Sequence, residues 1–313
     1  MKIVVTDGYT INPGDLSWDK LKEFGQVDVY DRTDPEEFYE RVKDAEIILT
    51  NKAVLYQGLL DKLDKLKYVG VTATGINVID LELASDRGIV VTNVPGYGTE
   101  AVAQHVFALL LELTNSVGKT SENVHKGRWQ EVGEWCYWDQ PLIELSKKTM
   151  GIIGMGLIGQ KVGEIAEAFG MRVQYSSPRK KDVKFSHVSL EELCQSSDVI
   201  SLHCPLNEKT DGLINRDRLK VMKPTAILIN TGRGQLINEQ DLAKALKEDT
   251  IGAAALDVLS EEPPKANPLI GAPNCLITPH HAWAARESRQ RLIDISIDNV
   301  RAYLAGERQN VVN

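Results

Sequence analysis

The sequence predicts an α/β fold made of two doubly wound parallel-sheet domains. Short apolar runs typical of buried strands alternate with helical patterns along the whole chain, and this alternation favours parallel sheets. With 313 residues the chain is long enough to bury two hydrophobic cores. A G-x-G-x-x-G motif begins at Gly154, so about 150 residues precede it and another domain is expected before the dinucleotide site.

The first predicted domain comprises residues 1–98 and 286–313. The chain leaves this domain near 95–98, where a proline and two glycines interrupt the pattern. Residues 284–304 form a helical pattern that must pack against a core, and the first domain is the candidate. The five strands expected in this domain are 2–6, 27–30, 47–50, 68–71 and 90–92.

The second predicted domain comprises residues 99–285 and opens with a long helix. Thr99 and Glu100 suit the start of this helix, which is nearly apolar all round and is therefore expected to be buried between domains or subunits. Residues 126–145 hold three tryptophans with little periodicity and are interpreted as an ordered loop. The strands expected here are 149–153, 172–175, 199–203, 226–230, 252–256 and 275–278.

The glycine motif lies between a strand-like run and a helical run, which is the context a dinucleotide site requires. Gly154 allows a tight turn, Gly156 lets a pyrophosphate approach the backbone, and Gly159 lets helix and strand pack closely. The free N–H groups of the helix start, at Leu157 and Ile158, would then face the phosphates. The alternative is a glycine-rich turn in an ordinary βα unit.

Composition and charge argue against several other classes of protein. The net charge is -8 and no basic cluster exceeds 179–181, so we expect no nucleic-acid partner. No apolar run approaches the length of a membrane span, and the first residues predict a strand and not a signal peptide. The four cysteines are scattered without CxxC spacing, which favours a cytoplasmic location and predicts no metal site.

Three polar segments follow strands of the second domain. They are 230–234 with Arg233, 257–263 with its carboxylates, and 278–281 with two histidines. Ligands bind at this edge of open α/β sheets. A guanidinium can hold a carboxylate, an imidazole can pass a proton, and a carboxylate beside the imidazole can orient the ring and stabilise its charged form. With a hydride from a nicotinamide, this set would reduce a 2-keto acid.

These segments resemble the D-isomer-specific 2-hydroxyacid dehydrogenase family over essentially the whole chain. The resemblance implies a flavodoxin-like substrate domain, a Rossmann dinucleotide-binding domain, a homodimer, and a substrate site between the domains. The matching motifs are TNVPG at 92–96, GIIGMGLIG at 151–159, HCP at 203–205, NTGRG at 230–234, ALDV at 255–258, EP at 262–263 and TPH at 278–280.

The resemblance also implies roles for single residues. Arg233 would bind the substrate carboxylate and carbonyl, Glu262 would tune the histidine, and His280 would be the acid/base residue. The remaining residues of the cofactor site would be Thr99, Cys204, Pro205, Thr231, Gly232, Asp257 and Trp283, together with Arg233 and His280.

Each of these residues has an alternative interpretation. Arg233 could be a surface arginine, Glu261 competes with Glu262, and His281 competes with His280. The family places the functional groups directly before the proline and directly after Thr-Pro, which favours Glu262 and His280. His105, on the long apolar helix, is interpreted as a core or interface histidine.

The cofactor prediction rests on the end of the second strand of this domain. NAD-specific sites place an acidic residue about 20 residues beyond the glycines, where it accepts from the ribose hydroxyls. Ser177 stands at that position here, and Arg179 follows it. A hydroxyl and a cation at this position could bind a 2′-phosphate, which favours NADP(H). If these cations form only a solvated turn, NAD(H) is the cofactor.

The substrate prediction rests on the first domain. Ala73, Thr74 and Gly75 resemble the family's substrate loop, and Lys52 matches a position that some members fill with a basic residue, although a surface lysine is the equal alternative. The segment 135–145 with Trp283 resembles the glycerate dehydrogenase and hydroxypyruvate/glyoxylate reductase branch, which implies small 2-keto acids. A dinucleotide-sensing binding protein and a phosphite-type oxidoreductase are the alternatives.

Overall fold

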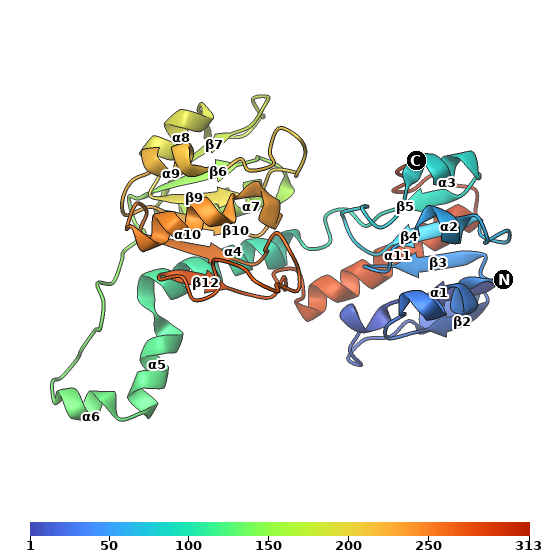
Figure 1. The fold of residues 1–313 in the computed structure, drawn as a ribbon, viewed down its shortest axis with the longest axis horizontal. Helices are drawn as coiled ribbons and strands as arrows, with labels where there is room; N and C mark the ends of the chain where they lie inside the picture. Colours follow the sequence, from blue (N-terminus) through green and yellow to red (C-terminus); the bar gives the residue numbers. More distant parts are fainter. The chain divides into compact units, whose positions relative to one another are not determined.

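The computed structural model describes all residues from Met1 to Asn313. The chain forms two compact units (Figure 1). Unit 1 consists of Met1–Gly98 with Ala284–Asn313, and unit 2 of Thr99–Trp283. Each unit holds one fully parallel sheet with helices between most consecutive strands, which confirms the predicted fold class.

The sheet of unit 1 has five strands in the order β2-β1-β3-β4-β5. Strands β3 and β4 are buried over their full length, as expected of central strands in a parallel sheet. From β1, the chain first adds β2 on one side and then adds β3, β4 and β5 on the other side. This switch in the direction of winding gives the doubly wound arrangement. The strands are β1 (Lys2–Val5), β2 (Gln26–Val29), β3 (Ile47–Thr50), β4 (Tyr68–Val71) and β5 (Val90–Thr92), and the α-helices are α1 (Pro35–Val42), α2 (Gln57–Leu60), α3 (Leu81–Asp86) and α11 (Arg286–Leu304).

Helix α11 returns the end of the chain to unit 1. Near its start, the Arg289 guanidinium donates to both carboxylate oxygens of Asp15 at 2.8 and 2.7 Å and to the Ile11 carbonyl at 2.9 Å. Such a two-pronged pair fixes direction as well as distance. Farther along, Asn299 donates to the Asn93 carbonyl at 2.9 Å. These bonds join α11 to the loops of unit 1.

The sheet of unit 2 has seven strands in the order β12-β11-β10-β9-β6-β7-β8. Its direction of winding switches between β6 and β9, the place where doubly wound sheets bind ligands. The sequence did not predict β8, which has only two exposed residues. The strands are β6 (Thr149–Ile153), β7 (Arg172–Ser176), β8 (Ser186–His187), β9 (Val199–Leu202), β10 (Ile227–Asn230), β11 (Ala253–Leu256) and β12 (Cys275–Ile277), and the helices between them are α7 (Leu157–Ala168), α8 (Leu190–Ser196), α9 (Arg216–Val221) and α10 (Glu239–Lys247).

Helix α4 (Thr99–Asn115) opens unit 2 as expected, but its burial has another cause than the one predicted. Its buried side chains join the hydrophobic core of unit 2, where α4 packs against α7, β10 and β11. Gln104 and Ala108 on the same helix are exposed. The apolar character of α4 is thus accounted for inside one unit.

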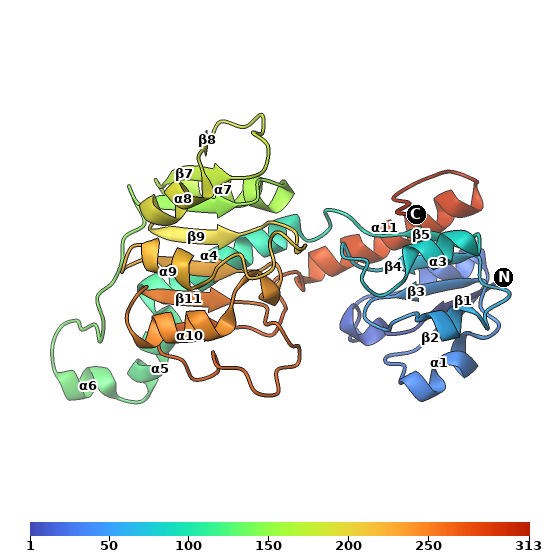
Figure 2. The same ribbon diagram turned by 45° about the horizontal axis from the view of Figure 1, so that its top comes forward.

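Beyond α4 the chain forms an arm of two helices, α5 (Val117–His125) and α6 (Arg128–Val132), which extends away from the sheet of unit 2 in both views (Figures 1 and 2). The prediction of a loop over 126–145 was wrong at α6. Gly127 and Gly133 have positive φ and end this five-residue helix on both sides, and the Trp129 indole donates to the Glu134 carbonyl at 2.9 Å. No helix of the protein is both long and apolar enough to cross a membrane.

Candidate active site

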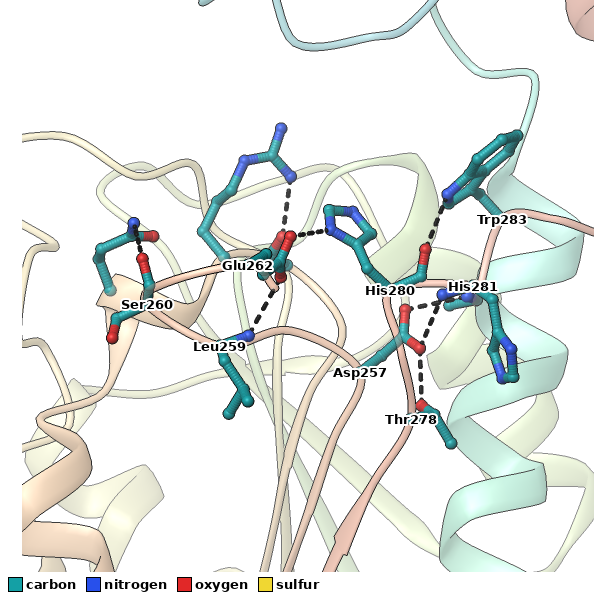
Figure 3. A network of polar contacts seen from close by, with 12 residues as sticks. Asp257, Leu259, Ser260, Glu262, Thr278, His280, His281 and Trp283 are labelled. Atoms are coloured by element: carbon teal, nitrogen blue, oxygen red, sulfur yellow. Dashed lines mark hydrogen bonds and ion pairs between the residues drawn. The ribbon is translucent and has the colours of Figure 1, made fainter. Parts of the chain in front are cut away.

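The candidate site lies at the carboxyl ends of β10, β11 and β12. Because neighbouring parallel strands end at the same edge, the three polar segments predicted from the sequence come together there. Figure 3 shows the segments after β11 and β12 side by side, with Glu262 directed at His280.

His280 and Glu262 form the central pair of the site. The Nδ1 atom of His280 lies 2.6 Å from Oε2 of Glu262, and the other oxygen of Glu262 accepts from the Leu259 backbone N–H at 3.1 Å. This second bond fixes the carboxylate plane that faces the ring. Glu261 pairs instead with Lys265 at 3.0 Å on the surface. The structure therefore brings Glu262, and not its neighbour, to the imidazole.

The backbone of His280 is held in an uncommon conformation. Its φ is 52°, in the left-handed region that residues other than glycine seldom adopt. Its N–H donates to the Asp257 carbonyl at 2.7 Å, and its carbonyl accepts from the Trp283 indole at 2.9 Å (Figure 3). Backbone outliers of this kind persist only when their surroundings over-determine them, and they gather at functional sites.

The Asp257 side chain is bonded within the fold. The residue is 1% exposed. One carboxylate oxygen accepts from the Thr278 hydroxyl at 2.6 Å and the His281 backbone N–H at 3.0 Å, and the other accepts from the Ala282 N–H at 2.9 Å. Its side chain thus fixes the segment that carries His280.

Arg233 follows β10 and has an exposed side chain. Its guanidinium donates to the Gly232 carbonyl at 2.8 Å, and Asn230 anchors the same turn through bonds to Arg233 and Gly232. The Arg289 guanidinium, by comparison, is engaged by Asp15. An accessible guanidinium at this edge suits a carboxylate ligand.

Three other histidines of unit 2, His105, His203 and His281, are engaged within the fold. Nε2 of His105 lies 3.1 Å from the Thr278 hydroxyl, and the His281 ring meets the His105 ring edge-on. His203 pairs with the Ser201 hydroxyl at 2.8 Å. Burial lowers the pKa of His203 to about 4, so it is neutral at physiological pH.

The glycine motif has the local geometry that a dinucleotide site needs. Gly154 has φ 98°, and a Cβ atom there would lie 2.5 Å from the Cys204 backbone nitrogen. A Cβ at Gly159 would lie 2.2 Å from the Gly154 carbonyl oxygen. A Cβ at Gly156 would meet nothing within 4 Å, so the space in front of the α7 N-terminus is open. Helix N-termini of this kind bind phosphate groups.

An orphaned hydroxyl next to this edge also fits a cofactor. Oγ1 of Thr231 is buried and has no hydrogen-bond partner within the protein. Buried polar groups are nearly always paired, so a bound molecule is the natural partner of this hydroxyl. Cys204 is partly buried, which raises the pKa of its thiol, and Pro205 and Leu157 are exposed. Together these residues fit a dinucleotide along the edge of unit 2.

The predicted specificity residues lie on the loop after β7. The Ser177 hydroxyl donates to the Arg179 carbonyl at 2.6 Å, and its own carbonyl lies 3.0 Å from the His187 ring. The Arg179 side chain is exposed and enters no ion pair. The loop is therefore ordered by its own bonds while its cation faces solvent.

Four of the residues predicted to touch substrate lie in unit 1, after β3 and β4. Lys52 is exposed, and the Thr74 hydroxyl donates to the Val94 carbonyl at 2.9 Å between the partly buried Ala73 and Gly75. Sequence reasoning missed Asp7, whose buried carboxylate accepts the backbone N–H groups of residues 51–53. The rule that singled out polar residues after strands of unit 2 would also have found Asp7, which follows β1.

Comparisons with known proteins agree with this geometry. Residues 107–282 match the family "D-isomer specific 2-hydroxyacid dehydrogenase, NAD binding domain". A hydroxypyruvate reductase of Blautia hydrogenotrophica is 49% identical over 321 aligned positions that cover 100% of both chains. An acyclic imino acid reductase solved with NADPH and D-Arg has a TM-score of 0.88 at 36% identity and 100% coverage of both chains. An NADPH-dependent glyoxylate/hydroxypyruvate reductase of Sinorhizobium meliloti has a TM-score of 0.86 at 29% identity, with 99% and 97% coverage.

Fold, site and relatives together define a nicotinamide-dependent oxidoreductase with two α/β units. The chain belongs to the D-isomer specific 2-hydroxyacid dehydrogenase family. It acts on the CH–OH group of 2-hydroxy acids, or in the reverse direction on 2-keto acids, with NAD(P) as cofactor.

Proposed function

We propose that this enzyme works mainly as a reductase of small polar 2-keto acids such as hydroxypyruvate and glyoxylate. The observation that carries the proposal is the His280–Glu262 pair, 2.6 Å apart at the ligand-binding edge of a dinucleotide-binding unit. The names of the hydroxypyruvate reductase and glycerate dehydrogenase relatives support the choice of substrate.

The proposed roles follow from the free atoms of each group. Arg233 holds the substrate carboxylate through parallel N–H bonds and polarises the neighbouring carbonyl. Glu262 engages Nδ1 of His280, so Nε2 is the nitrogen that passes a proton to the carbonyl oxygen. The bound reduced nicotinamide supplies the hydride to the keto carbon. In the reverse direction the same imidazole takes the hydroxyl proton.

We propose that unit 1 contributes to substrate binding through its loops after β3 and β4. The backbone N–H groups of the loop 73–75 suit the substrate carboxylate, and Lys52 adds positive charge on the neighbouring loop. Because Asp7 fixes the backbone of Lys52, this side chain extends from a rigid base. Replacing Lys52 with Met should raise KM for hydroxypyruvate and leave KM for the cofactor unchanged. An unchanged KM for hydroxypyruvate would place Lys52 outside the site.

We further propose that NADPH is the preferred cofactor, with Ser177 and Arg179 holding its 2′-phosphate. A substituted Ser177→Asp enzyme tests this, because the added carboxylate would repel the phosphate and accept from ribose hydroxyls. The ratio of kcat/KM for NADPH to that for NADH should fall at least about tenfold, the effect of about 1.4 kcal/mol. A ratio that stays constant would show that this loop does not select the cofactor.

The segment that follows α6 supports a homodimer as the working form. Trp135, Trp138 and Leu142 are 88%, 65% and 57% exposed, and such apolar surface is typical of association sites. A hollow of about 460 Å³ near the base of the arm is lined by apolar residues including Leu111 and Phe169. Light scattering should give twice the 34.7 kDa chain mass, and Trp138→Arg should shift it toward the monomer. A monomer for the unmodified protein would refute this arrangement. We place the enzyme in the cytoplasm.

Two other functions make different predictions. A dinucleotide-sensing protein of this fold would bind NAD(P)H and turn over no 2-keto acid. A phosphite-type oxidoreductase would reduce NAD(P) in the presence of phosphite. A panel of 2-keto acids assayed with reduced cofactor, next to phosphite with oxidised cofactor, separates all three. Turnover restricted to phosphite, or absent throughout, would contradict the reductase proposal.

A further inference from the structure

A buried chain of hydrogen bonds lies behind His280. The Asp257 carboxylate accepts from the Thr278 hydroxyl, two residues before His280, and from the N–H groups of His281 and Ala282, directly after it. The carboxylate therefore holds the backbone on both sides of His280 (Figure 3). Of these three hydrogen bonds to Asp257, only the one from Thr278 comes from a side chain, because the other two donors belong to the backbone.

His105 extends this chain from α4. Its Nε2 atom lies 3.1 Å from the Thr278 hydroxyl and 3.5 Å from the nearer Asp257 oxygen. A hydroxyl has one hydrogen, and Thr278 gives it to a carboxylate, which can only accept. The Thr278 oxygen can therefore only accept from His105, so Nε2 of His105 carries a hydrogen. The order of donation runs from His105 to Thr278 to Asp257.

The surroundings of His105 favour the neutral ring with that single tautomer. Burial lowers the pKa of His105, and the edge-on His281 ring acts in the same direction, whereas the Asp257 charge opposes them. The ligand atoms of His105, Asp257 and His281 lie within 4.8 Å of one another, a spacing that a cation could also use. In this network of hydrogen bonds, however, Nε2 of His105 carries a hydrogen and three donors already bond to the Asp257 oxygens.

We infer that His105 and Thr278 are positioning residues that keep the His280 segment in its left-handed conformation for proton transfer. This inference rests on the proposed role of His280. A φ of 52° is unfavourable for histidine, so the segment relaxes when its anchors weaken. Relaxation turns the ring away from Glu262, the partner that holds it 2.6 Å away. The chain His105–Thr278–Asp257 opposes that motion from the core of unit 2.

The test compares variants that keep or remove one hydrogen-bond donor at a time, at Thr278 or at His105. Thr278→Val removes the hydroxyl in the same shape, and Thr278→Ser restores it. His105→Phe removes the donor, and His105→Gln keeps an N–H at a similar distance. Thr114→Val is the matched control, because its buried hydroxyl donates only to carbonyls of the same helix, Leu110 and Leu111, and has no link to Asp257.

The measurements are kcat and KM for hydroxypyruvate, the dissociation constant for NADPH, and the isotope effect with deuterated NADPH. We expect Thr278→Val to lower kcat about 10- to 100-fold, the effect of one hydrogen bond to a charged group. The dissociation constant for NADPH should stay within about twofold, since the phosphate site is untouched. The isotope effect should rise as the chemical step becomes limiting. Thr278→Ser and Thr114→Val should keep most of kcat.

The outcomes separate this inference from the function on which it rests. If Thr278→Val and His105→Phe keep kcat within about threefold while His280→Ala is inactive, the hydrogen bonds His105–Thr278–Asp257 have no positioning role and the proposed function stands. An equal loss of kcat in Thr278→Ser and Thr278→Val would also overturn the inferred positioning role. Turnover that survives in His280→Ala would instead refute the acid/base assignment. If Thr278→Val does not fold, the His105→Phe and His105→Gln pair decides, with kcat retained only by glutamine.

Discussion

The orphaned hydroxyl of Thr231 makes opposite predictions for the free and the cofactor-bound enzyme. Thr231→Val replaces this hydroxyl with a methyl group of the same shape. In the free protein, Oγ1 of Thr231 is buried without a partner. An unpaired buried polar group destabilises a fold by about 1–3 kcal/mol, so valine should raise the free energy of unfolding by about that amount.

Cofactor binding should change in the other direction. If the hydroxyl pairs with the dinucleotide, valine loses one neutral hydrogen bond, worth about 1 kcal/mol or about fivefold in the dissociation constant. The assays are thermal unfolding without cofactor and a fluorescence titration with NADPH. The melting temperature of unit 2 should rise by about 2–4 °C for each kcal/mol gained.

Thr114→Val serves as the control for this experiment. Its hydroxyl is fully buried like that of Thr231, but it donates to the Leu110 carbonyl at 2.9 Å. Losing a satisfied bond should leave stability equal or lower, without effect on NADPH binding. A Thr231→Val enzyme that melts lower and binds NADPH as tightly as before would refute the assignment of Thr231 to the cofactor site.

Three further predictions concern the histidines. His280→Ala should abolish turnover in steady-state assays while His281→Ala retains it, and the reverse result would exchange their roles. Glu262→Gln removes the charge beside Nδ1 of His280, so reductive kcat should decline at lower pH than in the unmodified enzyme; an unchanged pH profile would contradict the pairing. The pKa of His203 is lowered from 6.5 to about 4 in the fold, so the unfolded chain binds its proton first as pH falls. The free energy of unfolding should therefore decrease between about pH 6.5 and pH 4, by up to about 3 kcal/mol. Denaturant unfolding of His203→Gln should show a weaker decline, and equal slopes would contradict a neutral buried ring.

The strands that sequence patterns located best are the buried ones. The predicted bounds of β3, β4, β5 and β6 agree with the structure at both ends, because these runs are buried and apolar and end at polar or glycine residues. The bounds of β2 shifted by one residue, since this edge strand is only half-buried and lacks a sharp apolar contrast. Strand β8 has two exposed residues and leaves no pattern at all.

Sequence motifs also predicted that Arg233, Glu262 and His280 lie at one edge of the sheet, because the carboxyl ends of neighbouring parallel strands lie at the same edge. The contact of Glu262 with His280 is observed, while the catalytic roles remain predictions. The sequence could not show that Asp257 serves the backbone of its neighbours, since that depends on its burial under α4. The short helix α6 was missed because its five residues between Gly127 and Gly133 are too few to show a helical period.

The most direct test of the account is the loss of reduced-cofactor absorbance with hydroxypyruvate and with glyoxylate, measured for the unmodified enzyme and His280→Ala in parallel. We expect turnover of both keto acids by the unmodified enzyme, faster with NADPH than with NADH, and none by the variant. Absence of turnover with either keto acid and either cofactor, in protein that still binds NADPH, would contradict the proposed reductase function.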